Sequence, residues 1–254
     1  MGAAGGAGML AASGLAQNEA ARKTRVYLLE RYYFKAGAQL GLFHDYISKA
    51  GLAALDKVHK GPKIVLEAFI ASHTPQAAVI LGFSTISEFW SIRAKLNEDA
   101  ELAKAYAAWQ SGPEPPFESQ TNALLEAADY SPEVVALDPP PKTPRVFELR
   151  VYRAPSQRQL KLLHERFSGP QLKIFQRAGV NPALYASTVI GPDMPNLTYL
   201  IPFDDMAARD KAWSAFSADP EWAKLRQEFA AANGQATLFN QIELFRATAY
   251  SPIR

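Results

Sequence analysis

Three polar side chains alternate along one short segment in the second half of the chain. Glu148, Arg150 and Tyr152 are two positions apart within residues 146–153, and apolar residues fill the positions between them. Side chains two positions apart in a β-strand share one face, so the three groups form a row. Such a row can anchor an anionic or carbonyl-bearing ligand, or the carboxylate and the guanidinium can simply neutralise each other.

The apolar residues of this segment occupy its opposite face. Phe147, Leu149 and Val151 are expected to pack under helices, which places Glu148 and Arg150 toward the interior of the sheet structure. In the structural interpretation, Glu148 and Arg150 form an ion pair in which each neutralises the charge of the other. A polar anchor inside an apolar pocket is the functional alternative.

Histidine could add proton transfer to this row. His44 and His164 both stand beside apolar residues in helix-like segments, where an imidazole can form a buried hydrogen bond, move a proton or bind a cofactor. Arg150 would then stabilise an enolate-like oxygen while His164 or Glu148 moves the proton. The candidate ligand-binding residues are Glu148, Arg150, Tyr152, His164 and Tyr185, the last on an expected strand.

The composition excludes several other kinds of site. The 254 residues include no cysteine, which excludes thiolate nucleophiles, zinc ribbons and iron–sulfur clusters. No histidines and carboxylates stand at metal-ligand spacing, and no phosphate-binding glycine loop, G-x-S-x-G or H-E-x-x-H motif occurs. We expect no metal and no cofactor, with a haem on one histidine left open. A net charge of +2, spread along the chain, argues against nucleic-acid binding.

The chain resembles itself at a displacement of 120 residues. Residues from about 25 to 132 align without a gap with residues from about 145 to 252. Matching pairs include Leu29 and Leu149, Tyr32 and Tyr152, His44 and His164, Phe83 and Phe203, and the Tyr-Ser-Pro strings at 130–132 and 250–252. Copies of this length indicate a duplicated domain rather than a solenoid.

Each copy predicts the order strand, helix, strand, strand, helix, strand. The first copy places strands at 25–33, 64–71, 77–83 and 119–128 and helices at 38–57, 86–95 and 98–110. The second copy places strands at 146–153, 183–190, 197–203 and 237–248. Its helices begin after Ser156 and after Asp204 or Asp205, and a further helical turn opens at Asp219.

This order predicts the α+β class with tandem ferredoxin-like βαββαβ domains. Helices cover one face of each antiparallel sheet, and the other apolar face needs a partner. The two sheets can cover each other, which forms an intramolecular pseudo-dimeric α+β barrel with a cavity between them.

An N-terminal segment and a proline-rich stretch near the middle of the chain mark the boundaries of its expected parts. Residues 2–16 are small, apolar and uncharged, like the end of a truncated twin-arginine export signal, which indicates a periplasmic or secreted protein; without export the protein is cytoplasmic. The expected parts are a signal-like or disordered segment 1–21, a first domain 22–133, a proline-rich linker 134–144 and a second domain 145–254. No stretch is long and apolar enough for a membrane span.

The second copy resembles the NIPSNAP family of the dimeric α+β barrel superfamily. The resemblance rests on the string FELRVY at 147–152, on His164 and on the string ADPEW at 218–222. The first copy resembles the family more loosely, with LLERY at 28–32 and DAEL at 99–102. The resemblance implies two tandem NIPSNAP-like domains and no agreed activity. Related barrels include cofactor-free monooxygenases, haem-degrading enzymes, chlorite dismutases and muconolactone isomerases.

Two functions follow as expectations. The first is a module of uncharacterised activity that binds a small apolar or carbonyl-bearing ligand, or a partner protein, through the barrel. The second is a cofactor-independent monooxygenase- or isomerase-like enzyme acting in the barrel cavity. Convergence of Arg150, Tyr152 and His164 on one cavity with Glu148 would favour the enzyme. Whether the protein is an enzyme, and whether it forms a homo-oligomer through sheet edges, is left open by the sequence.

Overall fold

The computed structural model describes residues 23–254, so the predicted signal-like segment lies outside the described residues. The strands of the first half are β1 (Val26–Tyr33), β2 (Lys63–Ile70), β3 (Gln76–Phe83) and β4 (Ser119–Ala127). Between β1 and β2 the chain forms α1 (Gln39–Tyr46), a turn of π-helix (Ile47–Gly51) and α2 (Leu52–Val58), where the sequence predicts one helix. Helices α3 (Ile86–Asn97) and α4 (Ala100–Gln110) precede β4.

The second half follows the same order of elements. Its strands are β5 (Val146–Arg153), β6 (Leu184–Ile190), β7 (Asn196–Phe203) and β8 (Phe239–Ala247), and its helices are α5 (Gln157–Ser168), α6 (Pro170–Ala178), α7 (Met206–Ala218) and α8 (Pro220–Asn233). Ser156 caps α5 and Asp205 caps α7, as the sequence predicts. Helix α8 is much longer than the predicted turn, because Trp222 and Leu225 pack one helical turn apart against the core. Every helix of residues 23–254 is too short or too polar to cross a membrane.

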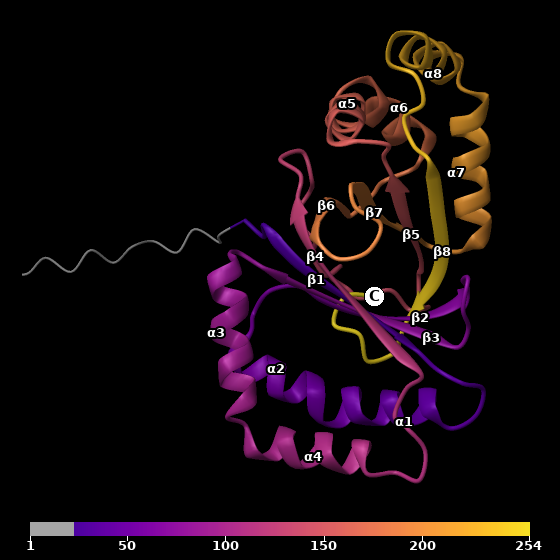
Figure 1. The fold of residues 1–254 in the computed structure, drawn as a ribbon. Helices are drawn as coiled ribbons and strands as arrows, with labels where there is room; N and C mark the ends of the chain where they lie inside the picture. Colours follow the sequence, from indigo (N-terminus) through magenta and orange to yellow (C-terminus); the bar gives the residue numbers. More distant parts are fainter. Residues whose placement is uncertain (1–22) are drawn as a thin grey trace, which may run out of the picture.

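The strands of the described chain form one closed antiparallel barrel in the order β1-β3-β2-β8-β5-β7-β6-β4. Each half contributes four adjacent strands, and the β2–β8 and β4–β6 pairings join the halves. The helices lie outside the barrel, α1 to α4 on one side and α5 to α8 on another (Figure 1). The predicted α+β class and pseudo-dimeric barrel are therefore confirmed.

Both halves contribute to one apolar core inside the barrel. Tyr27 and Leu29 of β1 belong to the same buried cluster as Phe147 and Leu149 of β5. Alternation along each strand sends these side chains inward and turns the intervening residues toward the helices. Each sheet thus covers the apolar face of the other.

One ion pair also lies inside the barrel. Arg31 on β1 and Glu243 on β8 are each two positions from an interior residue, and Arg31 Nη2 lies 3.4 Å from Glu243 Oε2. Their side chains are only 7% and 1% exposed. Neither carboxylate oxygen of Glu243 has a hydrogen-bond donor within residues 23–254. The arginine is therefore the main group that compensates the buried negative charge.

Arg31→Met should lower the free energy of unfolding by about 3–5 kcal/mol, because it leaves the Glu243 carboxylate buried without its cation. The double change Arg31→Met with Glu243→Leu should recover most of this loss, since it removes both charges. Urea unfolding followed by circular dichroism measures both effects. Equal losses in the single and double variants would contradict a stabilising pair.

Candidate functional site

The β5 row, made up of Glu148, Arg150 and Tyr152, faces the helices of the second half. Trp213 Nε1 on α7 donates a hydrogen bond to Glu148 Oε2 at 2.9 Å. Phe147 points the other way, into the core shared by both halves. The predicted alternation is confirmed, but the predicted assignment of the two faces is wrong.

The reason lies in what each face offers to a charged group. The barrel interior is filled by apolar side chains from both sheets, and an unpaired carboxylate there would lose its hydration. Under α7, Glu148 meets Trp213 and also Arg209, whose Nε lies 2.6 Å from Glu148 Oε2. Arg209 and Trp213 are four positions apart and therefore share one face of the helix. This spacing is the sequence signal that could have revealed both partners.

Glu148 anchors Arg150 rather than facing a ligand. The Glu148 side chain is completely buried, Arg150 Nε donates to its Oε1, and two donors from α7 occupy its Oε2. Glu148 does not line the neighbouring pocket, so Arg150 and Tyr152 are the groups that the row presents there.

Arg150 is held in a fixed position. Its Nη1 donates to the Tyr152 hydroxyl at 2.8 Å, and its Cζ lies 3.8 Å from the centroid of the Trp213 ring. Burial alone would lower the pKa of Arg150, but the neighbouring tyrosines and Glu148 outweigh it and raise that pKa above its usual range. The guanidinium is therefore a permanent positive charge at the pocket wall.

A pocket of about 240 Å3 adjoins the β5 row, between the barrel and the helices of the second half. Its main lining residues are Arg150, Tyr152, Arg166, Phe175, Trp213, Phe216, Trp222 and Arg226. Aromatic rings thus form much of the wall, and the charged lining groups are positive. This combination suits a flat apolar ligand with an electron-rich oxygen.

Arg166 on α5 is a half-buried cation in this pocket, and it has no acidic partner among residues 23–254. Its Cζ lies 4.6 Å from the Phe229 ring centroid and 5.5 Å from that of Trp222, and its Nε donates to Gln171 Oε1 at 2.8 Å. Burial lowers the pKa of Arg166, and no carboxylate of residues 23–254 forms an ion pair that would offset this effect. The sequence analysis missed this residue, because a helical arginine carries no signal of the rings around it.

His164 lies apart from the β5 row. Its Nδ1 is 2.8 Å from the Tyr130 hydroxyl and its Nε2 is 2.7 Å from Ser187 Oγ. Burial lowers the pKa of His164, which favours the neutral imidazole. The ring lines a different pocket, of about 500 Å3, so the predicted convergence of His164 with the β5 row does not occur.

Tyr185 is a core residue of the second half. Its ring is almost completely buried and stacks on Tyr199, with 5.8 Å between the ring centroids. Tyr185 does not line the pocket beside the β5 row. Its predicted role in ligand binding therefore finds no support in its position.

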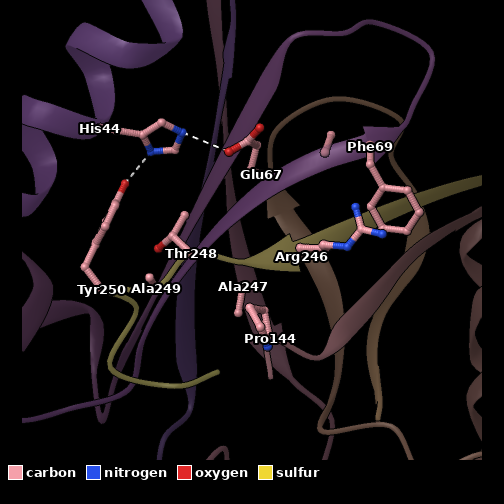
Figure 2. A pocket seen from close by; sticks show the side chains of 10 residues that line it. His44, Glu67, Phe69, Pro144, Arg246, Ala247, Thr248, Ala249 and Tyr250 are labelled. Carbon is pink, nitrogen blue, oxygen red and sulfur yellow. Dashed lines mark hydrogen bonds and ion pairs between the residues drawn. The ribbon is translucent and has the colours of Figure 1, made fainter. Parts of the chain in front are cut away.

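His44 occupies the corresponding place in the first half (Figure 2). Its Nδ1 is 2.6 Å from the Tyr250 hydroxyl and its Nε2 is 3.1 Å from Glu67 Oε2. Tyr130 follows the last strand of the first half and Tyr250 that of the second, so each histidine is bound by the tail of the other half. Both ring nitrogens of His44 and His164 are occupied, and a haem iron would have to displace one of these bonds. Within residues 23–254, no three His, Asp or Glu side chains are grouped to hold a metal ion.

The first half has a carboxylate where the second half has Arg150. Glu30 stands 120 positions before Arg150, and Tyr32 stands 120 positions before Tyr152. The Tyr32 hydroxyl lies 3.4 Å from Glu30 Oε2, and burial raises the pKa of Glu30 to about 7. The two halves therefore place a carboxyl group and a guanidinium at matching positions beneath their helices.

Comparison with protein families identifies the part of the chain that carries the β5 row. Residues 147–252 match the family model of NIPSNAP. The second half of the chain is therefore similar to a NIPSNAP domain over nearly its whole length, and it is called the NIPSNAP domain here. This match agrees with the resemblance of the FELRVY string at 147–152. It does not identify a specific activity. No curated protein matches the chain.

Solved structures share the fold of the NIPSNAP domain and its first-half counterpart. A proposed monooxygenase from Lactobacillus acidophilus NCFM has a TM-score of 0.56 at 9% identity, covering 91% of this chain and 98% of its own. An anthrone oxidase-like protein has a TM-score of 0.55 at 11% identity, with coverages of 89% and 92%. A NIPSNAP family protein of unknown function from Agrobacterium tumefaciens aligns with 44% of this chain and 95% of its own, at 18% identity and a TM-score of 0.37. The first two similarities establish the barrel fold over nearly the whole chain.

Glu30→Gln should make the stability of the protein less dependent on pH. The folded protein holds the Glu30 proton up to about pH 7, whereas the carboxyl of an unfolded chain releases it near pH 4.5. The parent protein should therefore lose stability as the pH rises between these values. Above about pH 7 the variant should be more stable than the parent by roughly 1–3 kcal/mol.

Urea unfolding near pH 4.5 and near pH 8 measures this difference. The exposed substitution Glu126→Gln serves as the control and should leave the pH dependence unchanged. A Glu30→Gln variant whose stability follows the parent across the whole range would contradict the buried, protonated carboxyl.

Proposed function

We propose that the NIPSNAP domain binds a small aromatic molecule carrying a carboxylate or a carbonyl oxygen, in the pocket beside the β5 row. The observation that supports this most directly is Arg166, a cation set against aromatic rings without a carboxylate partner among the described residues. Removing a cation from water costs free energy unless an acceptor compensates it. An anionic or carbonyl oxygen of a ligand is such an acceptor.

The rest of the pocket complements the body of this ligand. Trp213, Phe175 and Trp222 offer ring surfaces for stacking or edge contacts. Arg150 uses Nε for Glu148 and Nη1 for Tyr152, so a further guanidinium nitrogen has no partner within residues 23–254. A volume of about 240 Å3 is small for a ligand pocket and suits a molecule of about one or two rings.

Binding is better supported than the oxygenase or isomerase alternative. Those reactions need an acid–base group within hydrogen-bond reach of the arginine that stabilises the developing oxyanion. The donors around Glu148 already occupy both of its oxygens, and His164 lines a separate pocket. The similar barrels, one described as a monooxygenase and one as anthrone oxidase-like, share the fold at identities of 9% and 11%, and a shared fold does not imply a shared reaction.

Benzoate is the probe for this site, with benzyl alcohol as its neutral counterpart. Because Trp213 and Trp222 line the pocket, benzoate binding should change the tryptophan fluorescence. Arg166→Gln should weaken benzoate binding about tenfold or more, since it removes a cation that has aromatic rings but no described carboxylate around it. Arg158→Gln lies on the same helix but outside the pocket and should bind benzoate like the parent.

Isothermal titration calorimetry gives the affinities, and thermal unfolding establishes that both variants are folded. Equal benzoate affinity in Arg166→Gln and Arg158→Gln would overturn the proposed site. Benzyl alcohol binding as tightly as benzoate would overturn the requirement for a charged or carbonyl oxygen.

A further inference from the structure

A third pocket lies outside the barrel, at the seam where β2 of the first half pairs with β8 of the second. Its volume is about 360 Å3, and its main lining residues are His44, Glu67, Phe69, Arg246, Thr248 and Tyr250. Figure 2 shows His44 and Glu67 at one side and Arg246 beside Phe69 at the other. The walls come from both halves, so this seam pocket exists only when the barrel is closed.

Two opposite charges in the seam pocket are neighbours in the sheet without pairing. Glu67 stands directly opposite Arg246 in the β2–β8 register, a placement in which opposite charges usually attract each other. Glu67 is instead bonded to His44, and the Arg246 guanidinium lies over the Phe69 ring, 4.3 Å from its centroid. The two charges are thus held apart across the pocket.

A hydrogen-bond chain fixes the Glu67 carboxylate. The Tyr250 hydroxyl lies 2.6 Å from His44 Nδ1, and burial together with the nearby Glu67 charge raises the pKa of Tyr250 to about 12. On the other side of the ring, His44 Nε2 donates a hydrogen bond to Glu67 Oε2 at 3.1 Å. Glu67 Oε1 has no hydrogen-bond partner in the described part of the chain, and the side chain is 48% exposed. This oxygen is open to a ligand.

The second seam of the barrel provides an internal comparison. The pocket around His164 lies at the β4–β6 seam, where Ser187 and Glu126 stand opposite each other. Ser187 corresponds to Glu67 and Glu126 corresponds to Arg246, since each pair is 120 positions apart in the sequence. The second seam therefore has a hydroxyl and a carboxylate where the first has two opposite charges.

We propose that the seam pocket binds a small zwitterion of the α-amino acid type, with its ammonium group on Glu67 and its carboxylate on Arg246. Such a ligand satisfies both separated charges at once, whereas a simple anion or cation satisfies only one. The Phe69 ring and neighbouring alanines offer apolar surface to its side chain. This inference is independent of the ligand proposed for the pocket beside the β5 row.

Calorimetric titration of the full chain with L-leucine and L-phenylalanine tests this inference. At least one of them should bind in the millimolar range or more tightly. Its N-acetyl derivative lacks the ammonium charge and its amide lacks the carboxylate, so each should bind about tenfold more weakly or worse. Glu67→Gln and Arg246→Gln should each weaken binding of the free amino acid to a similar extent.

Ser187→Ala at the second seam is the matched control and should bind the amino acid like the parent. Thermal unfolding establishes that each variant is folded. If Glu67→Gln does not fold, Arg246→Gln, at an exposed position, is the variant that tests the inference. Absence of binding by both amino acids would overturn the inference. Equal binding of the free, acetylated and amidated forms would overturn it too, because the two charges would then play no part.

Discussion

Burial of the apolar sheet faces is the constraint on which the barrel depends. Helices cover one face of each four-stranded sheet, and the opposite face is covered only by the other half of the chain. The residues of that face, such as Leu29 in the first half and Phe147 in the second, form one continuous core. Buried apolar area contributes roughly 25 cal/mol per Å2, so separating the halves would expose both faces at a large free-energy cost. The two seams and the pockets beside them exist because of this mutual burial.

The same constraint determines where polar groups lie. An apolar interior leaves little room for the charges of the strands, so Glu148 turns outward to donors on α7, and Arg150 lies over the ring of Trp213 on the same helix. Arg31 and Glu243 are inside only as a pair. The tails that follow the last strand of each half cross to the opposite half, where Tyr130 and Tyr250 bond the two histidines. The hydrogen bonds of both histidines to these tyrosines therefore depend on closure of the barrel.

The fold followed from local patterns, whereas the site depended on packing between distant segments. Alternating strands, the caps at Ser156 and Asp205, and the order of elements all appear in the sequence within a few residues of where they act. The direction in which a strand turns its polar face depends on what covers each side. The strand pattern alone therefore predicts the wrong side for Glu148 and Arg150. The surroundings of Arg166 come from α6 and α8 and have no local signature.

Joining the two halves in one chain allows their sites to differ. A barrel built from two identical subunits must carry the same side chains at both equivalent positions, because one gene encodes them. Here the position of Arg150 is Glu30 in the first half, and the position of Glu67 is Ser187 in the second. The backbone frame is the same at each pair of positions, so these exchanges change the charge of a pocket without changing the strands that support it. A duplicated barrel can therefore hold ligands of different chemistry at positions that symmetry would otherwise make identical.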